Sequence, residues 1–184
     1  MKTGITGGIG SGKSYVARRL NALYGVEVYD CDSAAKRLMR TSPTLHRKLT
    51  RLIGPDTYME GQLNKAAVAR FLLASEENKQ ALNAIVHPAV FRDFEQSGLL
   101  WMESAIIFES GIHRLVDRVI VVTAPEEIRL QRVMERDGIS REKALEWIQR
   151  QWPQEKVRSL SDYEIVNDGL ADIDQQIETF FNSL

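Results

Sequence analysis

The pattern of apolar and polar positions along the chain predicts an α/β fold with a parallel sheet. Residues 117–123, DRVIVVT, form the clearest buried strand because β-branched residues dominate them. Residues 99–108 are a mostly apolar run that contains AIIF, and they predict another strand. Shorter strands are predicted at 1–6, 26–30 and 163–166. Continuous apolar strands separated by helices are typical of a parallel sheet covered on both faces.

Helical periodicity accounts for most of the chain between these strands. Residues 13–24 carry apolar side chains at helical spacing, and Gly25 follows as a helix stop. Residues 32–96 are mostly helical and form a block between the second and third strands. Further helices are predicted to open at 124–127 and to span 140–150 and 173–181.

Composition narrows the class of protein. The chain has 184 residues, of which 43% are apolar and 27% charged, and this suits one globular domain with a small inserted part. The 24 Lys and Arg residues nearly balance the 25 Asp and Glu residues, so no basic field argues for nucleic acid. A single cysteine, Cys31, excludes an internal disulfide. No apolar run resembles a signal peptide or reaches the ~20 residues of a membrane span, so we expect a cytoplasmic protein with no membrane partner.

The glycine-rich stretch GITGGIGSGKSY, residues 4–15, carries the most specific chemistry. Within it, residues 7–14 satisfy G-x-x-x-x-G-K-[ST], the phosphate-binding loop known as Walker A. Glycines let successive N–H groups converge on an anion, and the following helix adds its positive dipole end. Lys13 then reaches the β- and γ-phosphates, while the Ser14 hydroxyl binds Mg²⁺. The alternative is a glycine-rich turn without a ligand, but the preceding strand and following helix favour the phosphate loop.

Two aspartates, Asp30 and Asp32, follow the second predicted strand. Ligands of open α/β sheets bind beyond the carboxyl ends of the strands, which is also the edge of the phosphate loop. A carboxylate there accepts the proton of an attacking hydroxyl or supports Mg²⁺ through water. The alternative is that an aspartate caps the helix predicted to begin at Ser33. We expect one aspartate to be functional and the other to be a cap.

Other polar residues are less specific. His87 lies among apolar neighbours, so its residue type alone favours a structural role. Guanidinium groups suit phosphate binding, and several follow the fourth predicted strand. Interleaved acids would also suit two solvated, salt-bridged helices, but the helix–turn–helix placement favours a closing lid. These arginines are Arg129, Arg132, Arg136, Arg141, Arg150 and Arg158.

Blocks spread over nearly the whole chain resemble those of dephospho-coenzyme A kinase, in that family's order. They are TGGIGSGKS, YDCDSAAK, LNAIVHPAV, AIIFESG, RVMERDGISREKA and QWPQEKVRSLSDYEIVNDG. The resemblance implies the fold of nucleoside monophosphate kinases, a three-layer α/β/α arrangement with a five-stranded parallel sheet. The implied parts are a core at 1–31, 97–128 and 159–184, a helical substrate subdomain at 32–96, and a helical lid at 129–158.

The resemblance also implies the reaction, which is transfer of the γ-phosphate of ATP to the ribose 3′-hydroxyl of dephospho-coenzyme A. Lys13 and Asp32 are then the catalytic residues, and Ser14 binds Mg²⁺. The residues expected to bind the acceptor are Asp30, His87, Glu109 and Arg132. Those expected to bind ATP are Gly8, Ile9, Gly10, Ser11, Gly12, Lys13, Ser14, Tyr15, Arg136 and Asn167.

Three positions depart from the family pattern. Tyr15 replaces a usual threonine, Ala105 a frequent proline and Trp152 a frequent methionine. None of these changes removes a group that the chemistry needs.

Two other functions compete with this interpretation. One is a P-loop kinase for another small acceptor, such as a nucleotide, a sugar acid or a nucleoside. The other is a GTPase-like switch, which needs an N-K-x-D segment that the chain lacks. We therefore expect a kinase that acts as a monomer or weak homo-oligomer, with ATP and dephospho-coenzyme A as its partners and no nucleic acid.

Overall fold

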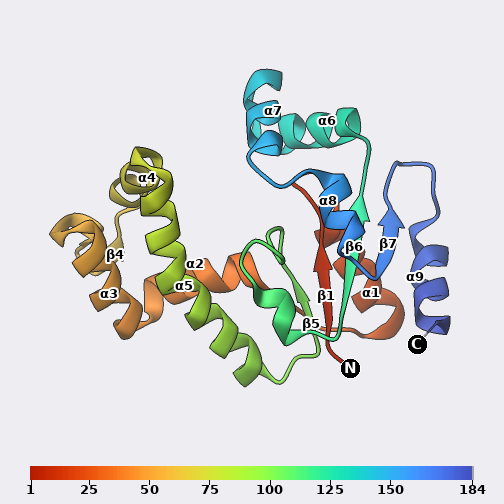
Figure 1. Cartoon of the computed structure of the whole chain (residues 1–184), viewed down its shortest axis with the longest axis horizontal. Helices are drawn as coiled ribbons and strands as arrows, with labels where there is room; N and C mark the ends of the chain where they lie inside the picture. Colours follow the sequence, from red (N-terminus) through yellow and green to blue (C-terminus); the bar gives the residue numbers. More distant parts are fainter. Residues whose placement is uncertain (184) are drawn as a thin grey trace. The chain divides into compact units, whose positions relative to one another are not determined.

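A computed structural model describes residues 1–183, which divide into two compact units (Figure 1). The first unit comprises Met1–Tyr29 and Leu99–Leu184, and the second is Asp30–Gly98. The second unit contains the predicted helical segment 32–96. Leu184, the last residue of the predicted core, lies outside the described residues.

A five-stranded sheet forms the centre of the first unit, in the order β2-β5-β1-β6-β7 (Figure 1). β1 pairs in parallel with β5 and β6, and β6 pairs in parallel with β7. The α/β fold class is thereby confirmed. The strands are β1 (Thr3–Thr6), β2 (Val28–Asp30), β5 (Trp101–Glu103), β6 (Arg118–Thr123) and β7 (Tyr163–Val166).

Helices α1 (Lys13–Tyr24) and α9 (Ile173–Asn182) cover one face of this sheet. Ile120 and Val122 of β6 join their core, while the intervening Val121 is buried on the other face. The alternation explains why β6 reads as continuously apolar, since each face of the strand has its own cover. Arg19 of α1 donates from Nε to Asp174 of α9 at 2.7 Å, which ties the two helices together.

The predicted strand over 99–108 is wrong in its second half. β5 ends at Glu103, and the AIIF residues form a turn. The Ile106 N–H donates to the Ser104 hydroxyl at 3.3 Å instead of joining a sheet ladder. Ile107 is nevertheless fully buried, with its Cδ1 2.4 Å from where a Cβ on Gly4 would lie. The apolar run therefore covers the sheet rather than extending it, and periodicity cannot separate these outcomes.

The second unit is helical, with a small hairpin between β3 and β4. At the hairpin turn Glu60 and Gly61 have φ of 49° and 76°, the paired left-handed conformation that tight hairpins require. The sequence pattern did not predict this hairpin. The elements are α2 (Cys31–Thr41), α3 (Pro43–Ile53), η1 (Pro55–Thr57), β3 (Tyr58–Met59), β4 (Gln62–Leu63), α4 (Lys65–Ala74) and α5 (Glu76–Ser97).

The remaining elements of the first unit follow β5 and β6. α6 and α7 pack through a small core of Leu130, Val133, Ala144 and Ile148. α7 begins after Ser140, whose hydroxyl accepts the Lys143 N–H at 3.3 Å, so the predicted helix over 140–150 is confirmed. These elements are η2 (Ile112–Leu115), α6 (Glu126–Asp137), α7 (Arg141–Gln149) and α8 (Gln154–Ser159).

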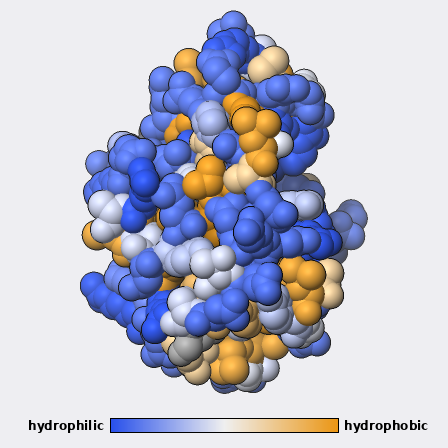
Figure 2. Space-filling model, turned by 90° about the vertical axis from the view of Figure 1, so that its right-hand side faces the viewer, coloured by the Kyte–Doolittle hydropathy of each residue, from blue (hydrophilic) through white to orange (hydrophobic). Residues whose placement is uncertain are grey.

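The surface on the α9 side is largely hydrophilic, with smaller apolar patches between the polar residues (Figure 2). Within residues 1–183, no helix combines the length and apolar character needed to cross a membrane.

Candidate active site

The glycine-rich loop lies between β1 and α1, so it has the strand–loop–helix context that a phosphate loop requires. Gly10 and Gly12 have φ of 79° and 93°, a left-handed conformation that favours glycine. Gly12 is also the N-cap of α1, which places Lys13 and Ser14 in the first helical turn. The N-terminal end of α1 therefore adds its positive dipole end to the loop.

Neighbouring segments approach the loop so closely that side chains on its glycines would collide with them. A Cβ on Gly8 would lie 2.3 Å from Nη2 of Arg129, and one on Gly10 would lie 2.5 Å from the Arg129 carbonyl oxygen. A Cβ on Gly12 would lie 2.1 Å from Nδ2 of Asn167. Because they lack side chains, the glycines allow α6 and the segment after β7 to pack closely against the loop, in addition to leaving room for a ligand.

Donors from these segments hold the carbonyl oxygens of the loop. Nε of Arg129 donates to Ile9 O at 3.0 Å, and Nδ2 of Asn167 donates to Ser11 O at 2.8 Å. Nη1 of Arg132 lies 3.3 Å from both Gly10 O and Ser11 O. Because a carbonyl oxygen repels a phosphate, donors that satisfy these oxygens favour an anion in the loop.

One N–H of the loop also has a protein partner. The Ile9 N–H donates to Oε1 of Gln151 at 2.7 Å, where Gln151 lies between α7 and α8. The amide oxygen of Gln151, like a phosphoryl oxygen, is a hydrogen-bond acceptor, but it carries no net charge. The Ile9 N–H is therefore already oriented toward an acceptor.

A cavity of about 420 Å³ adjoins the loop. Asn167, which is only 8% exposed, contributes to its wall and accepts from Nη2 of Arg132 at 3.3 Å. The size falls within the range of small-molecule sites, and the position suits the nucleoside part of a nucleotide bound through its phosphates. The lining residues are Gly12, Tyr15, Arg132, Asn167, Gly169, Ala171 and Ile173.

Glu103 is a site residue that the sequence analysis missed. It ends β5 next to β1, is 9% exposed, and its Oε1 accepts the Ser14 hydroxyl at 3.0 Å. A signal was present, since an acid ends an apolar strand at the carboxyl edge of the sheet. A hydroxyl and a carboxylate this close are the hard oxygen donors that Mg²⁺ prefers. The described residues contain no cluster of three or more acidic, histidine or cysteine ligands.

The two aspartates have different surroundings in the structure. β2 ends at Asp30 and α2 begins at Cys31, so the chain turns there and the predicted start at Ser33 is two residues late. Asp30 is the N-cap of α2: its Oδ1 accepts the Ser33 N–H at 3.0 Å and its Oδ2 accepts the Ser33 hydroxyl. Asp32 is exposed in the first turn of α2, and its carboxylate has no hydrogen bond or ion pair within residues 1–183.

His87 lies in α5, half-buried, with its ring stacked on Phe91 at a centroid distance of 6.1 Å. Burial lowers the pKa of this imidazole, which favours the neutral form. A neutral imidazole hydrogen-bonds a polar acceptor substrate without adding charge. The predicted role of His87 at the acceptor stays a prediction.

The other predicted residues lie in the first unit. Arg136 is 60% exposed at the end of α6 and pairs with its neighbour Asp137, whose pKa it lowers. Glu109 is half-buried in the turn that follows β5. Tyr15 lines the cavity beside the loop, where the guanidinium of Arg18 lies 5.9 Å from its ring centroid. Their predicted contacts with ATP or acceptor also stay predictions.

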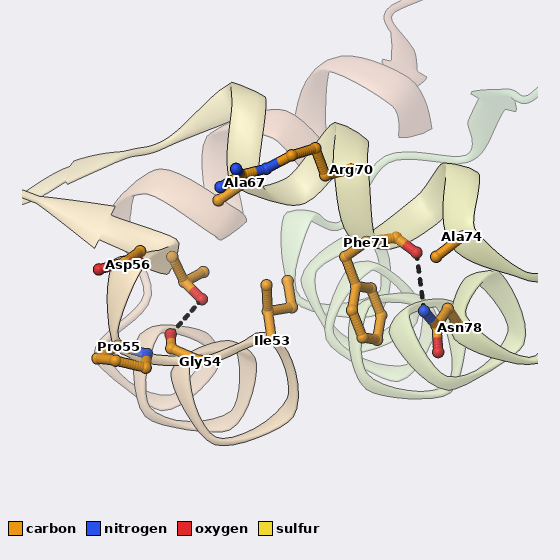
Figure 3. Close-up of a pocket in the computed structure, with 10 residues that line it drawn as sticks. Ile53, Gly54, Pro55, Asp56, Ala67, Arg70, Phe71, Ala74 and Asn78 are labelled. Carbon is orange, nitrogen blue, oxygen red and sulfur yellow. Dashed lines mark hydrogen bonds between the residues drawn. The ribbon is translucent and has the colours of Figure 1, made fainter.

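A second cavity, of about 310 Å³, lies within the helical unit (Figure 3). Phe71 points toward Ile53 inside it, while Arg70 extends along its upper edge (Figure 3). Two of its polar groups are already bonded, because the Thr57 hydroxyl donates to Gly54 O at 2.6 Å and Nδ2 of Asn78 donates to Phe71 O at 2.9 Å.

Comparison with known proteins identifies the relatives of this chain. A protein of Porphyromonas gingivalis named dephospho-CoA kinase is 45% identical over 89% of this chain and 84% of its own length. A dephospho-CoA kinase of Bacteroides fragilis is 38% identical over 96% of this chain and 89% of its own length. A Thermus thermophilus protein of known structure superposes with a TM-score of 0.86 at 33% identity, covering 100% of this chain and 97% of the other.

More distant structures agree in fold. A dephospho-CoA kinase from Campylobacter jejuni superposes with a TM-score of 0.67 at 22% identity, covering 100% of this chain and 97% of the other. The family model described as dephospho-CoA kinase matches residues 1–172, which include the phosphate loop, both aspartates and Asn167. The chain therefore belongs to the dephospho-CoA kinase family.

Proposed function

We propose that this protein transfers the γ-phosphoryl group of ATP to the ribose 3′-hydroxyl of dephospho-CoA, releasing ADP and coenzyme A. The observation that carries the proposal is a phosphate loop whose carbonyl oxygens are held by Arg129, Arg132 and Asn167, in a chain of this family. Such a loop is built to bind the phosphates of a nucleotide, and the family supplies the acceptor.

Lys13 and the loop N–H groups stabilise the charge that develops on the transferring phosphoryl group. Because phosphoryl transfer depends mainly on positioning and electrostatics, a loop fixed before ATP arrives lowers the cost of reaching the transition state. Ser14 and Glu103 would hold a magnesium ion that accompanies ATP, which would supply charge neutralisation at the phosphates. Glu103 thus joins Ser14 as a proposed metal-site residue.

Asp32 orients the acceptor hydroxyl and takes its proton. Its carboxylate is exposed and has no hydrogen-bond partner within residues 1–183, so it is available to a substrate. Asp30, by contrast, uses both oxygens to cap α2 and thereby fixes the start of the helix that carries Asp32. We assign Asp30 to positioning and Asp32 to general-base catalysis.

The adenosine part of ATP occupies the cavity beside Gly12, Tyr15 and Asn167. Arg132 lines the same cavity and contacts two loop carbonyls, so we now assign it to ATP rather than to the acceptor. Arg136 remains a proposed ATP residue, and His87 and Glu109 remain proposed acceptor residues. The segment 129–158 is the proposed lid, and the proposed solution state is a monomer or weak homo-oligomer in the cytoplasm.

The product identifies the reaction. With ATP, Mg²⁺ and dephospho-CoA, phosphorus NMR should show a new 3′-phosphomonoester and one ADP for each product molecule. A phosphate attached elsewhere, or ATP hydrolysis without acceptor phosphorylation, would contradict the proposal.

Glu103→Gln should raise the Mg²⁺ concentration needed for half-maximal rate by ~10-fold or more, because removing the charge weakens binding of a hard cation. An unchanged Mg²⁺ requirement would exclude Glu103 from the metal site.

A further inference from the structure

Arg129 differs from the other arginines that follow β6. It is only 6% exposed, whereas Arg136 and Arg141 have exposed side chains that pair with Asp137 and Glu127. Within residues 1–183 the Arg129 guanidinium has no ion pair, and its hydrogen bond goes to a main-chain carbonyl. A buried cation is costly unless it is paired, so its position needs an explanation other than the solvated lid surface.

The guanidinium of Arg129 reaches the phosphate loop. Its Nε donates to Ile9 O at 3.0 Å. The guanidinium also packs against Gly8, where an added Cβ would lie only 2.9 Å from Cζ of Arg129. Its main chain packs equally closely against Gly10. The side chain and main chain of Arg129 thereby contact three successive loop residues, which are Gly8, Ile9 and Gly10.

We infer that Arg129 is a positioning residue for the phosphate loop, which fixes the Ile9 peptide and places a permanent positive charge behind the bound polyphosphate. The charge belongs to the wall of the loop rather than to a mobile arm, because the side chain is buried and bonded before any ligand arrives. Burial lowers the pKa of this guanidinium, but an arginine remains charged at neutral pH. Glu126, on the same helix, partly offsets this lowering of the pKa but forms no ion pair with Arg129 within residues 1–183, and a bound polyphosphate would supply further negative charge.

This inference rests on the proposed function, since it concerns how the same loop binds phosphate. A role in folding alone makes a different prediction. If Arg129 were purely structural, its replacement would lower the stability of the free protein and would leave the ratio of the affinities for a phosphate ligand and a nucleoside unchanged. A positioning charge acts selectively on the anionic part of a nucleotide.

The test uses the full chain and two probes, inorganic tripolyphosphate and adenosine, measured by titration calorimetry. Arg129→Met keeps the length of the side chain but removes its charge and its hydrogen bond. It should weaken tripolyphosphate binding by ~10-fold or more, the scale of a lost charge-assisted contact, and leave adenosine binding within about twofold. The KM for ATP should rise by a similar factor, while the KM for dephospho-CoA stays unchanged.

Arg114→Met is the matched control, because it removes an exposed arginine of the same unit and so changes the net charge equally. It should leave both affinities within about twofold. Equal tripolyphosphate affinity in Arg129→Met and the parent, or a parallel loss of adenosine affinity, would overturn the inference. If Arg129→Met does not fold, Arg129→Lys decides: a selective loss for tripolyphosphate of about threefold supports the role of the planar guanidinium, and two unchanged affinities overturn it. A parent protein that does not bind tripolyphosphate would instead contradict the proposed function itself.

Discussion

Gly10→Ala tests whether close packing of α6 against the phosphate loop sets the geometry of catalysis. The new methyl group would lie 2.5 Å from the Arg129 carbonyl oxygen and 3.0 Å from its Cα. Both are main-chain atoms, so no side chain can rotate away. Restoring an ordinary contact of 3.4 Å from 2.5 Å requires the loop and α6 to separate by about 0.9 Å.

A displacement of this size is large for phosphoryl transfer, because a misplacement of ~1 Å costs on the order of 10²-fold in rate. The substitution also forces alanine to adopt φ of 79°, which costs roughly 1–2 kcal/mol of stability. Gly138→Ala is the matched control, since Gly138 has φ of 63° at the end of α6 and nothing within 4 Å of the added methyl. The two variants share the backbone strain and differ in the collision.

The assay follows ADP release in a coupled reaction with saturating dephospho-CoA, alongside thermal unfolding of each variant. Gly138→Ala should lose on the order of 1 kcal/mol of stability from backbone strain, and Gly10→Ala should lose more, because the collision adds an overpacking cost of roughly 1–3 kcal/mol. Gly10→Ala should lose about 10²-fold in kcat/KM for ATP, while Gly138→Ala retains most of its activity. A folded Gly10→Ala protein with kcat/KM within about threefold of Gly138→Ala would refute the argument from packing.

Three further predictions follow from single groups. Lys13→Ala should lower kcat by at least ~10²-fold in a folded protein, because it removes a charge that stabilises the transferring phosphoryl group, and near-normal turnover would exclude this loop from the chemistry. Asp32→Asn should lower kcat by ~10²-fold with little change in the KM for ATP, whereas Asp30→Ala should chiefly lower thermal stability by about 1 kcal/mol through loss of the helix cap, and the reverse pattern would exchange their roles. The pKa of His87 is lowered by burial from its ordinary value of 6.5, so the unfolded chain binds more protons near and below pH 6.5 and the protein should lose stability as pH falls. Thermal melts of His87→Gln should show a weaker loss of stability than the parent between about pH 6.5 and 5, and an identical pH dependence would show that burial of His87 is not responsible.

The elements of the fold were largely predictable because their signals are local. The helix predicted at residues 13–24 begins and ends where the structure places α1, since Gly12 and Gly25 both take left-handed conformations at its ends. β6 was recognisable from its β-branched residues. The segment 105–108 was misassigned because burial over a sheet and burial within it give the same apolar run. The β3–β4 hairpin was missed because two residues in each strand are too few to establish alternation.

The candidate site was predictable where chemistry and motif coincide in one segment, as in the phosphate loop. Partners that approach the loop from distant segments were not. Glu103 reaches Ser14 because β5 pairs with β1, which is a feature of strand order rather than of local pattern. Arg129 was grouped with lid arginines because its burial depends on the packing of α6 against Gly8 and Gly10. The glycines of the loop predicted a phosphate ligand but not the helix that packs against them.

The most direct test of the account compares acceptors in one assay with ATP and Mg²⁺. Dephospho-CoA, AMP, adenosine and shikimate are offered separately, and kcat/KM is measured for each. We expect the kcat/KM of dephospho-CoA to exceed that of every other acceptor by at least ~10²-fold, because its diphosphate and pantetheine contacts contribute to orienting the ribose hydroxyl. Equal or greater efficiency with AMP or adenosine would contradict the proposed function and indicate a nucleotide or nucleoside kinase.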